Sequence, residues 1–273
     1  MEQGSERVSV FLRVGVYVVL YVIVVYGTAS PLVWLGGQFL GLTVSSLLGA
    51  LTSNFLAVRI YERRPLHSIG LVWSATALRN LALGLAGGMG SVALVLGAPL
   101  AVGAAHLRID TAAGFSAGNF LFVALLLLLG AAGEEMFFRG YGFQAMLRAS
   151  GPYTTVVPVG VVFALLHSGN PGATPLALAN TAGFGILFGY AYLRSRDLWL
   201  PIGLHYGWNL ALPLFGVNVS GYALGSAGWR VEWDASELWS GGDYGPEGSV
   251  ITSAALFVLL VYLRSVRVAS PPA

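Results

Sequence analysis

The chain has 273 residues, of which 56% are hydrophobic and only 10% are charged. A soluble globular domain carries about 25% charged residues, so this composition predicts an integral membrane protein and excludes a soluble enzyme. The net charge is +2 without a basic patch of the kind that binds nucleic acid, so nucleic acid is not expected as a partner. The absence of Cys and Lys also excludes disulfides, thiolate metal sites and a Lys-containing phosphate loop.

Apolar segments long enough to cross a membrane recur along the whole chain. Such a segment needs about 20 mostly apolar residues. We predict an all-α, polytopic membrane helix bundle of about eight transmembrane helices, because the apolar segments fall into that number. No Ser-, Pro- or Gln-rich linker divides the chain, so residues 1–273 are expected to form a single domain. The expected spans are 8–27, 32–58, 81–103, 119–147, 154–168, 174–193, 198–215 and 249–264.

The connecting segments predict how the bundle sits in the membrane. Residues 61–80 are expected to turn at Pro65 and then form a helix along the interface, with Trp73 as its anchor. Residues 216–248 are acidic and rich in Trp, which favours a solvated loop over a ligand-binding lid. Arginines concentrate in the connections on the side of the N-terminus, so the positive-inside rule predicts a protein of the cytoplasmic membrane with both termini in the cytoplasm.

Polar side chains inside the apolar spans are the candidate functional residues, because such groups are costly at membrane depth. Residues i and i+4 share a helix face, so Glu135 and Arg139 should form an ion pair, while Glu134 points about 100° aside. A carboxylate without a cationic partner in a poorly hydrated site suits general acid–base chemistry. The three clusters are Glu134, Glu135 and Arg139 in GEEMFFRG, His167 in FALLHSGN, and His205 with Asn209 in GLHYGWNL.

Depth limits which of these clusters can meet. If the helix that carries Glu134 ended at Arg139, His167 would lie about 20 Å deeper in the membrane. We therefore predict that this helix continues through residues 141–147 to a break at 151–153. By the same count His205 remains shallower than the other two clusters. Each cluster alone has a structural interpretation as an ion pair, a packing histidine or a hydrogen bond between helices, but together they indicate a buried polar catalytic cavity.

The order of these motifs on successive helices resembles the CPBP (Abi) family of intramembrane proteases, which includes the type II CAAX prenyl endopeptidases. The resemblance covers a core of about residues 119–215 and implies a helix bundle around a polar cavity. It also implies hydrolysis of a peptide bond near the C-terminus of a prenylated or otherwise membrane-associated protein, with membrane lipids as the other partner. The matching residues are Glu134-Glu135-x-x-x-Arg139, Phe163-x-x-x-His167 and His205-x-x-x-Asn209.

The resemblance implies roles for single residues and leaves two alternatives open. Glu134 would activate the water with help from His167, and His205 and Asn209 would stabilise the oxyanion. In the first alternative, a metalloprotease, Glu134, His167 and His205 would bind Zn²⁺, although the chain has no H-E-x-x-H helix. In the second, the fold serves a transporter or proton relay, or an interaction or immunity factor, without peptidase activity. A serine protease is disfavoured because no G-x-S-x-G is present.

Overall fold

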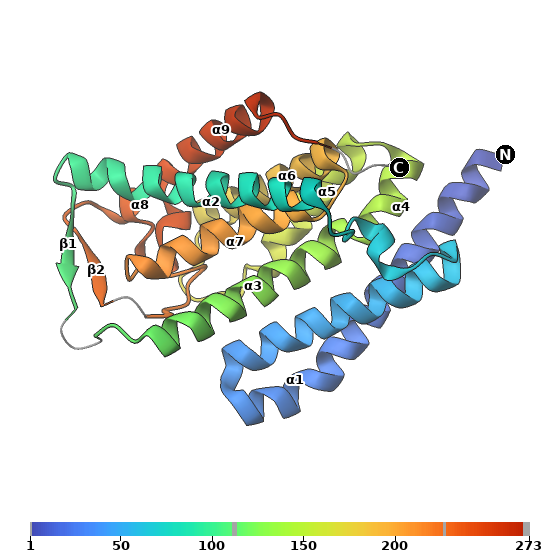
Figure 1. Ribbon diagram of the computed structural model, residues 1–273, viewed down its shortest axis with the longest axis horizontal. Helices are drawn as coiled ribbons and strands as arrows, with labels where there is room; N and C mark the ends of the chain where they lie inside the picture. The colour runs from blue at the N-terminus through green and yellow to red at the C-terminus, as the bar shows by residue number, and fades with distance from the viewer. Residues whose placement is uncertain (1, 111–113, 226–227, 270–273) are drawn as a thin grey trace.

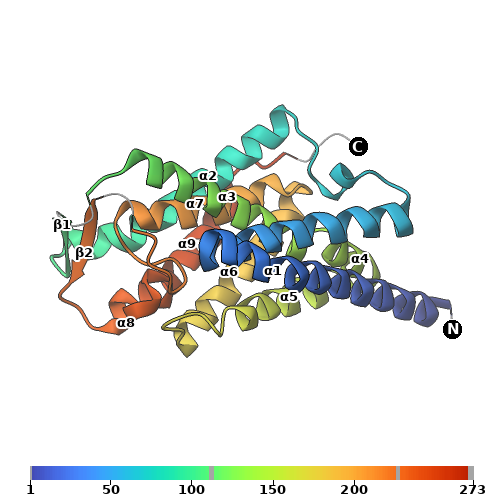
Figure 2. The same cartoon turned by 90° about the horizontal axis from the view of Figure 1, so that it is seen from below.

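The structure is a computed structural model that describes residues 2–110, 114–225 and 228–269. Figure 1 shows an elongated bundle whose helices run mainly along its long axis. The N-terminus and the C-terminus lie toward the same end of the bundle, and the two β-strands lie at the opposite end in both views (Figures 1 and 2). The chain is therefore mostly helical, as predicted, and the two ends of the bundle differ in character.

The first long helix is bent into two antiparallel arms (Figure 1). Helix α1 covers Glu2–Ala57, but Gly37 has the non-helical angles φ 81° and ψ 170°. A positive φ of this kind favours glycine, which explains why the chain turns there. Across the two arms, the hydroxyl of Tyr21 lies 2.8 Å from Oγ of Ser46. The predicted spans 8–27 and 32–58 thus form one hairpin, which turns later than the sequence indicates.

The remaining apolar segments all form helices. Within the part of the chain that the structure describes, four helical runs are long and apolar enough to cross a membrane, namely 7–62, 75–101, 117–150 and 175–195. Two further apolar helices, 153–166 and 250–265, are shorter, so the expected count of eight spanning helices is not confirmed. After α1 the helices are α2 (Ala75–Ala101), α3 (Ala117–Arg139), α4 (Tyr141–Ser150), α5 (Tyr153–Leu166), α6 (Pro175–Ser195), α7 (Trp199–Leu214), α8 (Glu237–Ser240) and α9 (Val250–Ser265).

The helical run that carries Glu134 reaches Ser150, as predicted, but it is broken at Gly140 into α3 and α4. At the break, the backbone N–H of Tyr141 donates to Oδ1 of Asn54 at 2.8 Å instead of to a carbonyl of its own helix. The amide of Asn54 in turn donates to the carbonyl of Met136 at 2.9 Å. A Cβ on Gly140 would lie 2.2 Å from the Asn54 amide oxygen, so only glycine fits. Asn54 of α1 therefore stabilises a break that the sequence of α3 and α4 alone does not predict.

Close packing of α2 against α7 forms the centre of the bundle. A Cβ on Gly84 or Gly88 of α2 would lie 2.4 or 2.3 Å from the carbonyl oxygen of Leu200 or Leu204 in α7. A Cβ on Gly203 of α7 would likewise lie 2.4 Å from a backbone oxygen of α2. Small residues at a spacing of four let membrane helices approach to backbone contact. This approach fixes the position of α7, which carries His205 and Asn209.

The end of the bundle opposite the termini is built from long-range contacts. Strand β1 (Ala105–Ile109) pairs in antiparallel fashion with β2 (Trp229–Trp233), with Ala105 opposite Trp233. The prediction that residues 216–248 form a solvated loop is wrong in part. This segment contains β2, α8 (Glu237–Ser240) and two short 3₁₀ turns, and the side chains of Tyr244 and Glu247 are buried. Val217, Val219 and Tyr244 of this segment are buried against the bundle, whereas Leu238 and Trp239 are exposed.

The connector after α1 differs from the predicted interfacial helix. A short π-helical segment, η1 (Val58–Glu62), is followed by only one 3₁₀ turn, η2 (Leu66–Ile69), before α2 begins. The turn ends at Gly70 with φ 100°, and the carbonyl of Gly70 accepts from the backbone N–H of Leu198 at 2.9 Å. The connector is thus fixed to the junction between α6 and α7. Trp73 is exposed, as expected of an anchor, and its ring contacts that of Trp199.

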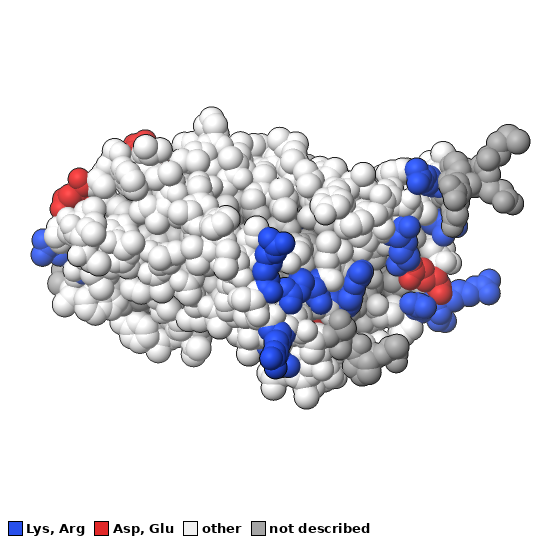
Figure 3. Space-filling view, turned by 90° about the horizontal axis from the view of Figure 1, so that it is seen from above, with Lys and Arg blue, Asp and Glu red and all other residues white. Residues whose placement is uncertain are grey.

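Charged side chains separate along the long axis. Figure 3 shows arginines from the middle of the molecule to the end that holds the N-terminus, with a mixed group of acidic and basic residues at the far end. The stretch of this face between those two groups carries almost no charge in this view. That distribution fits helices that cross a membrane, with the arginines at one of its surfaces.

Candidate active site

A cavity of about 280 Å³ lies among α1, α3, α5 and α7. Glu134, His167, His205 and Asn209 all line it, so the fold brings the three predicted clusters to one place. The wall opposite them comes from the second arm of α1, which the sequence did not indicate. Glu135 and Arg139 do not line this cavity and lie behind it in the protein.

Glu135 holds two partners at once. Its Oε1 accepts from Nη1 of Arg139 at 3.1 Å, and both side chains are fully buried, with 0% exposed. The predicted ion pair is therefore present. The same Oε1 lies 3.0 Å from Nδ1 of His205 on α7. A carboxylate only accepts, so Nδ1 of His205 carries the hydrogen and Nε2 is left for the cavity. His205 therefore reaches α3, although the sequence predicted that it would lie at a different depth in the membrane.

Arg139 is fixed by aromatic rings as well as by Glu135. Its guanidinium carbon lies 5.3 Å from the ring centre of Phe163 and 5.4 Å from that of Phe188. Its Nη2 donates to the backbone carbonyl of Gly185 on α6 at 2.6 Å. The flat guanidinium can stack on rings and donate hydrogen bonds at the same time, which an ammonium group cannot do as well. Arg139 therefore ties the end of α3 to α5 and α6.

Glu134 differs from Glu135 in its exposure and in its partners. Its side chain is 32% exposed, and it makes no side-chain hydrogen bond or ion pair to an arginine among the described residues, although Oε2 of both glutamates is without a hydrogen-bond partner. The nearest charged or titratable nitrogen is Nε2 of His205, 3.9 Å from Oε2. A distance of 3.9 Å is too long for a hydrogen bond. Glu134 is thus a carboxylate on the cavity wall that no arginine neutralises.

His167 and Asn209 complete the polar side of the cavity. Nδ1 of His167 lies 2.7 Å from the carbonyl of Phe163 one helical turn earlier, so it donates there and leaves Nε2 free. The ring of Phe163 also contacts the rings of His167 and His205 at 4.6 and 6.0 Å. The side chain of Asn209 lines the cavity and makes no hydrogen bond within the described part of the chain, so its amide can donate into the cavity.

The site does not present a ligand set for Zn²⁺. Among the described residues, no group of three or more His, Cys, Asp or Glu side chains is placed to hold a metal ion. Nδ1 of both histidines is engaged, by Glu135 and by the carbonyl of Phe163, which leaves Nε2 as the nitrogen of each ring that could bind a ligand. Among the described residues, Glu134, His167 and His205 are not grouped closely enough to support the alternative in which they bind zinc.

Sequence reasoning missed Glu247, which lies beneath the two histidines. A small cavity of about 20 Å³ is bounded by His167, His205, Ser220 and Glu247. The carboxylate of Glu247 accepts from Nε1 of Trp208 at 3.0 Å and from the backbone N–H of Ser220. Ser220 has a positive φ of 47°, which is unusual for a residue other than glycine. The acidic loop holds five carboxylates with no feature that sets Glu247 apart, so the sequence carried no signal for it.

Comparison with known proteins agrees with the motif resemblance. Residues 115–211 match the family described as Type II CAAX prenyl endopeptidase Rce1-like. The matched segment contains every predicted site residue, from Glu134 to Asn209. A search of curated proteins found no match to this chain.

Proposed function

Taking the Rce1-like character of residues 115–211 as the premise, we propose that the protein is a membrane endopeptidase. Its substrate is the lipid-modified or membrane-embedded tail of a protein, cut at a peptide bond near the C-terminus. The reaction is hydrolysis by a water molecule that Glu134 activates. Glu135 and Arg139 position His205 and do not react.

The observation that supports this assignment is the contrast between two adjacent glutamates. Glu135 is fully buried and bound to both Arg139 and His205. Glu134 lies on the cavity wall without a cationic partner at hydrogen-bond distance. A carboxylate held in this way keeps a lone pair available for a water proton, whereas Glu135 has no access to the cavity.

The cavity offers a complete set of groups for the reaction. Glu134 takes a proton from water, and the resulting hydroxide attacks the carbonyl carbon of the peptide bond. The amide of Asn209 donates to the oxyanion, and His205 donates from Nε2 when its ring carries both protons. As the C–N bond breaks, the leaving nitrogen receives the proton held by Glu134, with His167 assisting at its free Nε2. The carboxylate is then restored for the next turnover.

Apolar residues at the cavity rim favour a substrate that arrives from the lipid. Leu42 of α1 and Leu166 of α5 both line the cavity, and they are 42% and 63% exposed. In a bilayer, exposed leucines at the middle of a bundle face acyl chains. A peptide tail with a lipid attached can thus enter between these two helices without leaving the membrane.

A peptidase assay with the purified full-length chain in lipid nanodiscs tests the proposal. We expect cleavage of a farnesylated C-terminal peptide and at least about tenfold slower cleavage of the same peptide without the lipid, because the lipid supplies binding energy that holds the scissile bond in place. Addition of a zinc chelator should leave the rate unchanged, because no metal ligand set is found among the described residues.

Two results would contradict the proposal. No cleavage of either peptide, together with flux of ions or small molecules in proteoliposomes, would favour a transporter. Loss of cleavage with chelator and its return with Zn²⁺ would overturn the assignment of Glu134 as the base and restore the metalloprotease alternative.

A further inference from the structure

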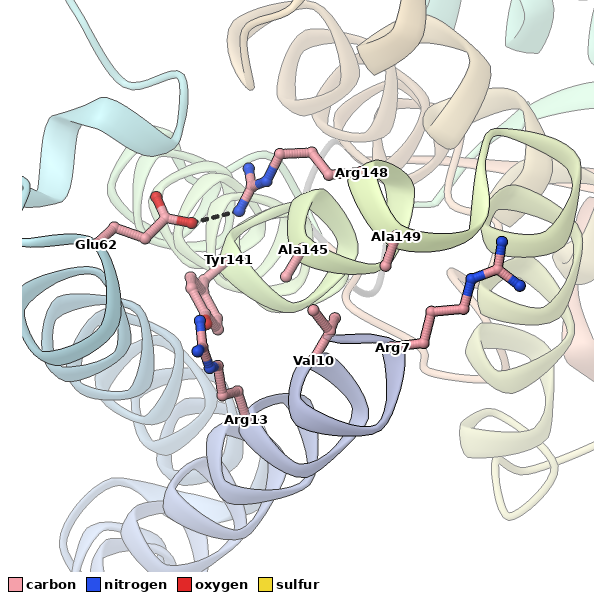
Figure 4. A pocket seen from close by; sticks show the side chains of 8 residues that line it. All are labelled: Arg7, Val10, Arg13, Glu62, Tyr141, Ala145, Arg148 and Ala149. Atoms are coloured by element: carbon pink, nitrogen blue, oxygen red, sulfur yellow. Dashed lines mark hydrogen bonds and ion pairs between the residues drawn. The ribbon is translucent and has the colours of Figure 1, made fainter. Parts of the chain in front are cut away.

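A second hollow, which shares no lining residue with the catalytic cavity, lies between the first arm of α1 and α4, toward the end of the bundle that holds the N-terminus (Figure 4). Its volume is about 550 Å³. Val10 of α1 and Ala145 and Ala149 of α4 form its apolar floor. Ala145 and Ala149 are one helical turn apart, and their small side chains leave the space that the hollow occupies.

Three arginines line this hollow against a single glutamate, a net charge of +2. Arg148 of α4 donates to the carboxylate of Glu62, so that carboxylate is already neutralised (Figure 4). Arg7 and Arg13 have no carboxylate partner among the described residues. The hollow therefore holds two uncompensated guanidinium groups from one helix, beside the neutral pair of Arg148 and Glu62.

The aromatic wall orients one of these arginines. The guanidinium carbon of Arg13 lies 5.4 Å from the ring centre of Tyr61, which stacks on Tyr141 at 5.9 Å. Figure 4 shows the guanidinium of Arg13 beside Tyr141 and that of Arg7 at the outer edge of the hollow. The hydroxyl of Tyr141 has no hydrogen-bond partner among the described residues. Donors from both helices are thus available to one anion.

The position of the hollow identifies the kind of anion. Just along α1, Val8, Phe11 and Leu12 are exposed apolar side chains, as expected for a helix face against acyl chains. Arginines at this level meet the phosphate groups of the lipid surface, and basic pockets between helices bind anionic headgroups. Topology alone requires arginines on this side of the membrane, but not that three of them line one hollow with small residues at its floor.

We propose that this hollow binds the phosphate-bearing headgroup of an anionic phospholipid, with its acyl chains against the exposed face of α1. Arg13, Tyr141 and the free N–H groups of Arg148 would contact the phosphate, and Arg7 at the outer edge of the hollow would add its positive charge to the attraction. The site is separate from the catalytic cavity and does not depend on peptidase activity.

Native mass spectrometry of the full chain, released from nanodiscs with equal amounts of phosphatidylglycerol and phosphatidylcholine of the same acyl chains, tests the proposal. We expect the wild type to retain phosphatidylglycerol, and the double variant Arg7→Gln/Arg13→Gln to bind it about 10- to 30-fold more weakly, since each arginine at the surface contributes about tenfold or less. Arg64→Gln is the matched control, because it removes one exposed arginine from the same end outside the hollow. It should change binding less than about twofold.

Equal binding of phosphatidylglycerol by the double variant and by Arg64→Gln would overturn the proposal, because the attraction would then be general to this surface. Displacement of the lipid by millimolar inorganic phosphate would also overturn it, since the ligand would then be a soluble anion. An unchanged thermal unfolding midpoint of the double variant excludes loss of fold as the reason for weaker binding.

Discussion

At the scale of single residues, adjacent positions on one helix take different parts because their surroundings differ. Glu134 and Glu135 have the same chemistry, but only Glu135 meets a cation, Arg139, and a histidine on another helix. Each histidine uses Nδ1 for a fixed acceptor and leaves Nε2 to the cavity. The atoms left to face the cavity, such as Nε2 of each histidine, are therefore those that fixed neighbours do not already engage.

Glu247 supplies a pH-dependent prediction at this scale. It lies in the turn before α9, and burial raises the pKa of its carboxyl above the ordinary value. The folded protein therefore holds a proton that the unfolded chain releases, so the contribution of Glu247 to stability falls as pH rises above about 4.3. We expect the unfolding midpoint of the wild type, relative to Glu247→Gln, to decrease between pH 4 and pH 7.

The decisive quantity is how the difference in unfolding midpoint between the wild type and Glu247→Gln changes with pH. In Glu247→Gln, the NH₂ of the new amide must face one of the two N–H donors, from Trp208 or from Ser220. The lost hydrogen bond lowers the free energy of unfolding by about 1–3 kcal/mol, and this loss does not vary with pH. Glu237→Gln, which removes an exposed carboxylate from the same loop, controls for net charge. If the midpoint of the wild type instead rises with pH relative to Glu247→Gln, the prediction is wrong, because the pKa of Glu247 is then not raised in the folded protein.

At the scale of helices, the approach of α2 to α7 sets the position of two of the residues proposed to be catalytic. The two backbones meet through Gly84 and Gly88 on one helix and Gly203 and Gly207 on the other. The same α7 presents His205 and Asn209 to the cavity. A change in the distance between these helices therefore moves His205 and Asn209 relative to Glu134 on α3.

Gly88→Ala should separate α2 from α7. Its Cβ would lie 2.3 Å from the carbonyl oxygen of Leu204, which is backbone and cannot move aside alone. We expect a loss of about 1–3 kcal/mol in the free energy of unfolding and a lower cleavage rate. Gly90→Ala on the same helix is the control, because nothing lies within 4 Å of its Cβ. An equal effect of the two variants on the unfolding midpoint would indicate that the helix contact is not what matters.

Local sequence patterns predict the helices well and their interruptions poorly. Every predicted apolar segment overlaps a helix of the structure over most of its length, because apolar length is a local property. The break at Gly140 depends on Asn54, and β1 depends on pairing with residues more than 100 positions away. The i, i+4 rule predicted the pair of Glu135 and Arg139, but not that His205 shares Glu135. Contacts of that range leave no periodic trace in a single sequence.

At the scale of the whole molecule, the two ends of the bundle carry different charges and different structure. Most of the arginines and both termini lie toward one end, and the β1–β2 ribbon, whose Arg108 and Arg230 pair with Glu232, occupies the other (Figures 1 and 3). The positive-inside rule then predicts that the arginine-rich end faces the cytoplasm. The headgroup site proposed above lies at this end, on the same membrane surface.

Single introduced cysteines test this orientation without background, because the natural chain has none. His67 in the connector and Ser236 before α8 are exposed and lie at opposite ends of the bundle. In intact cells, a membrane-impermeant maleimide should label Ser236→Cys and should label His67→Cys only after the membrane is opened. The reverse pattern would invert the orientation, and labelling of both from outside would contradict a spanning arrangement.

The most direct test of the account compares Glu134→Gln with Glu135→Gln in cleavage of the same farnesylated peptide, with the unfolding midpoint of each variant measured in parallel. Glu134→Gln should lose about 10²–10⁴-fold in rate with an unchanged midpoint, because only the base is removed. Glu135→Gln should lower the midpoint, since Arg139 is then buried without its counterion, a loss of about 3–5 kcal/mol. Cleavage by folded Glu134→Gln within about tenfold of the wild-type rate would contradict the account, because a general base contributes more than that.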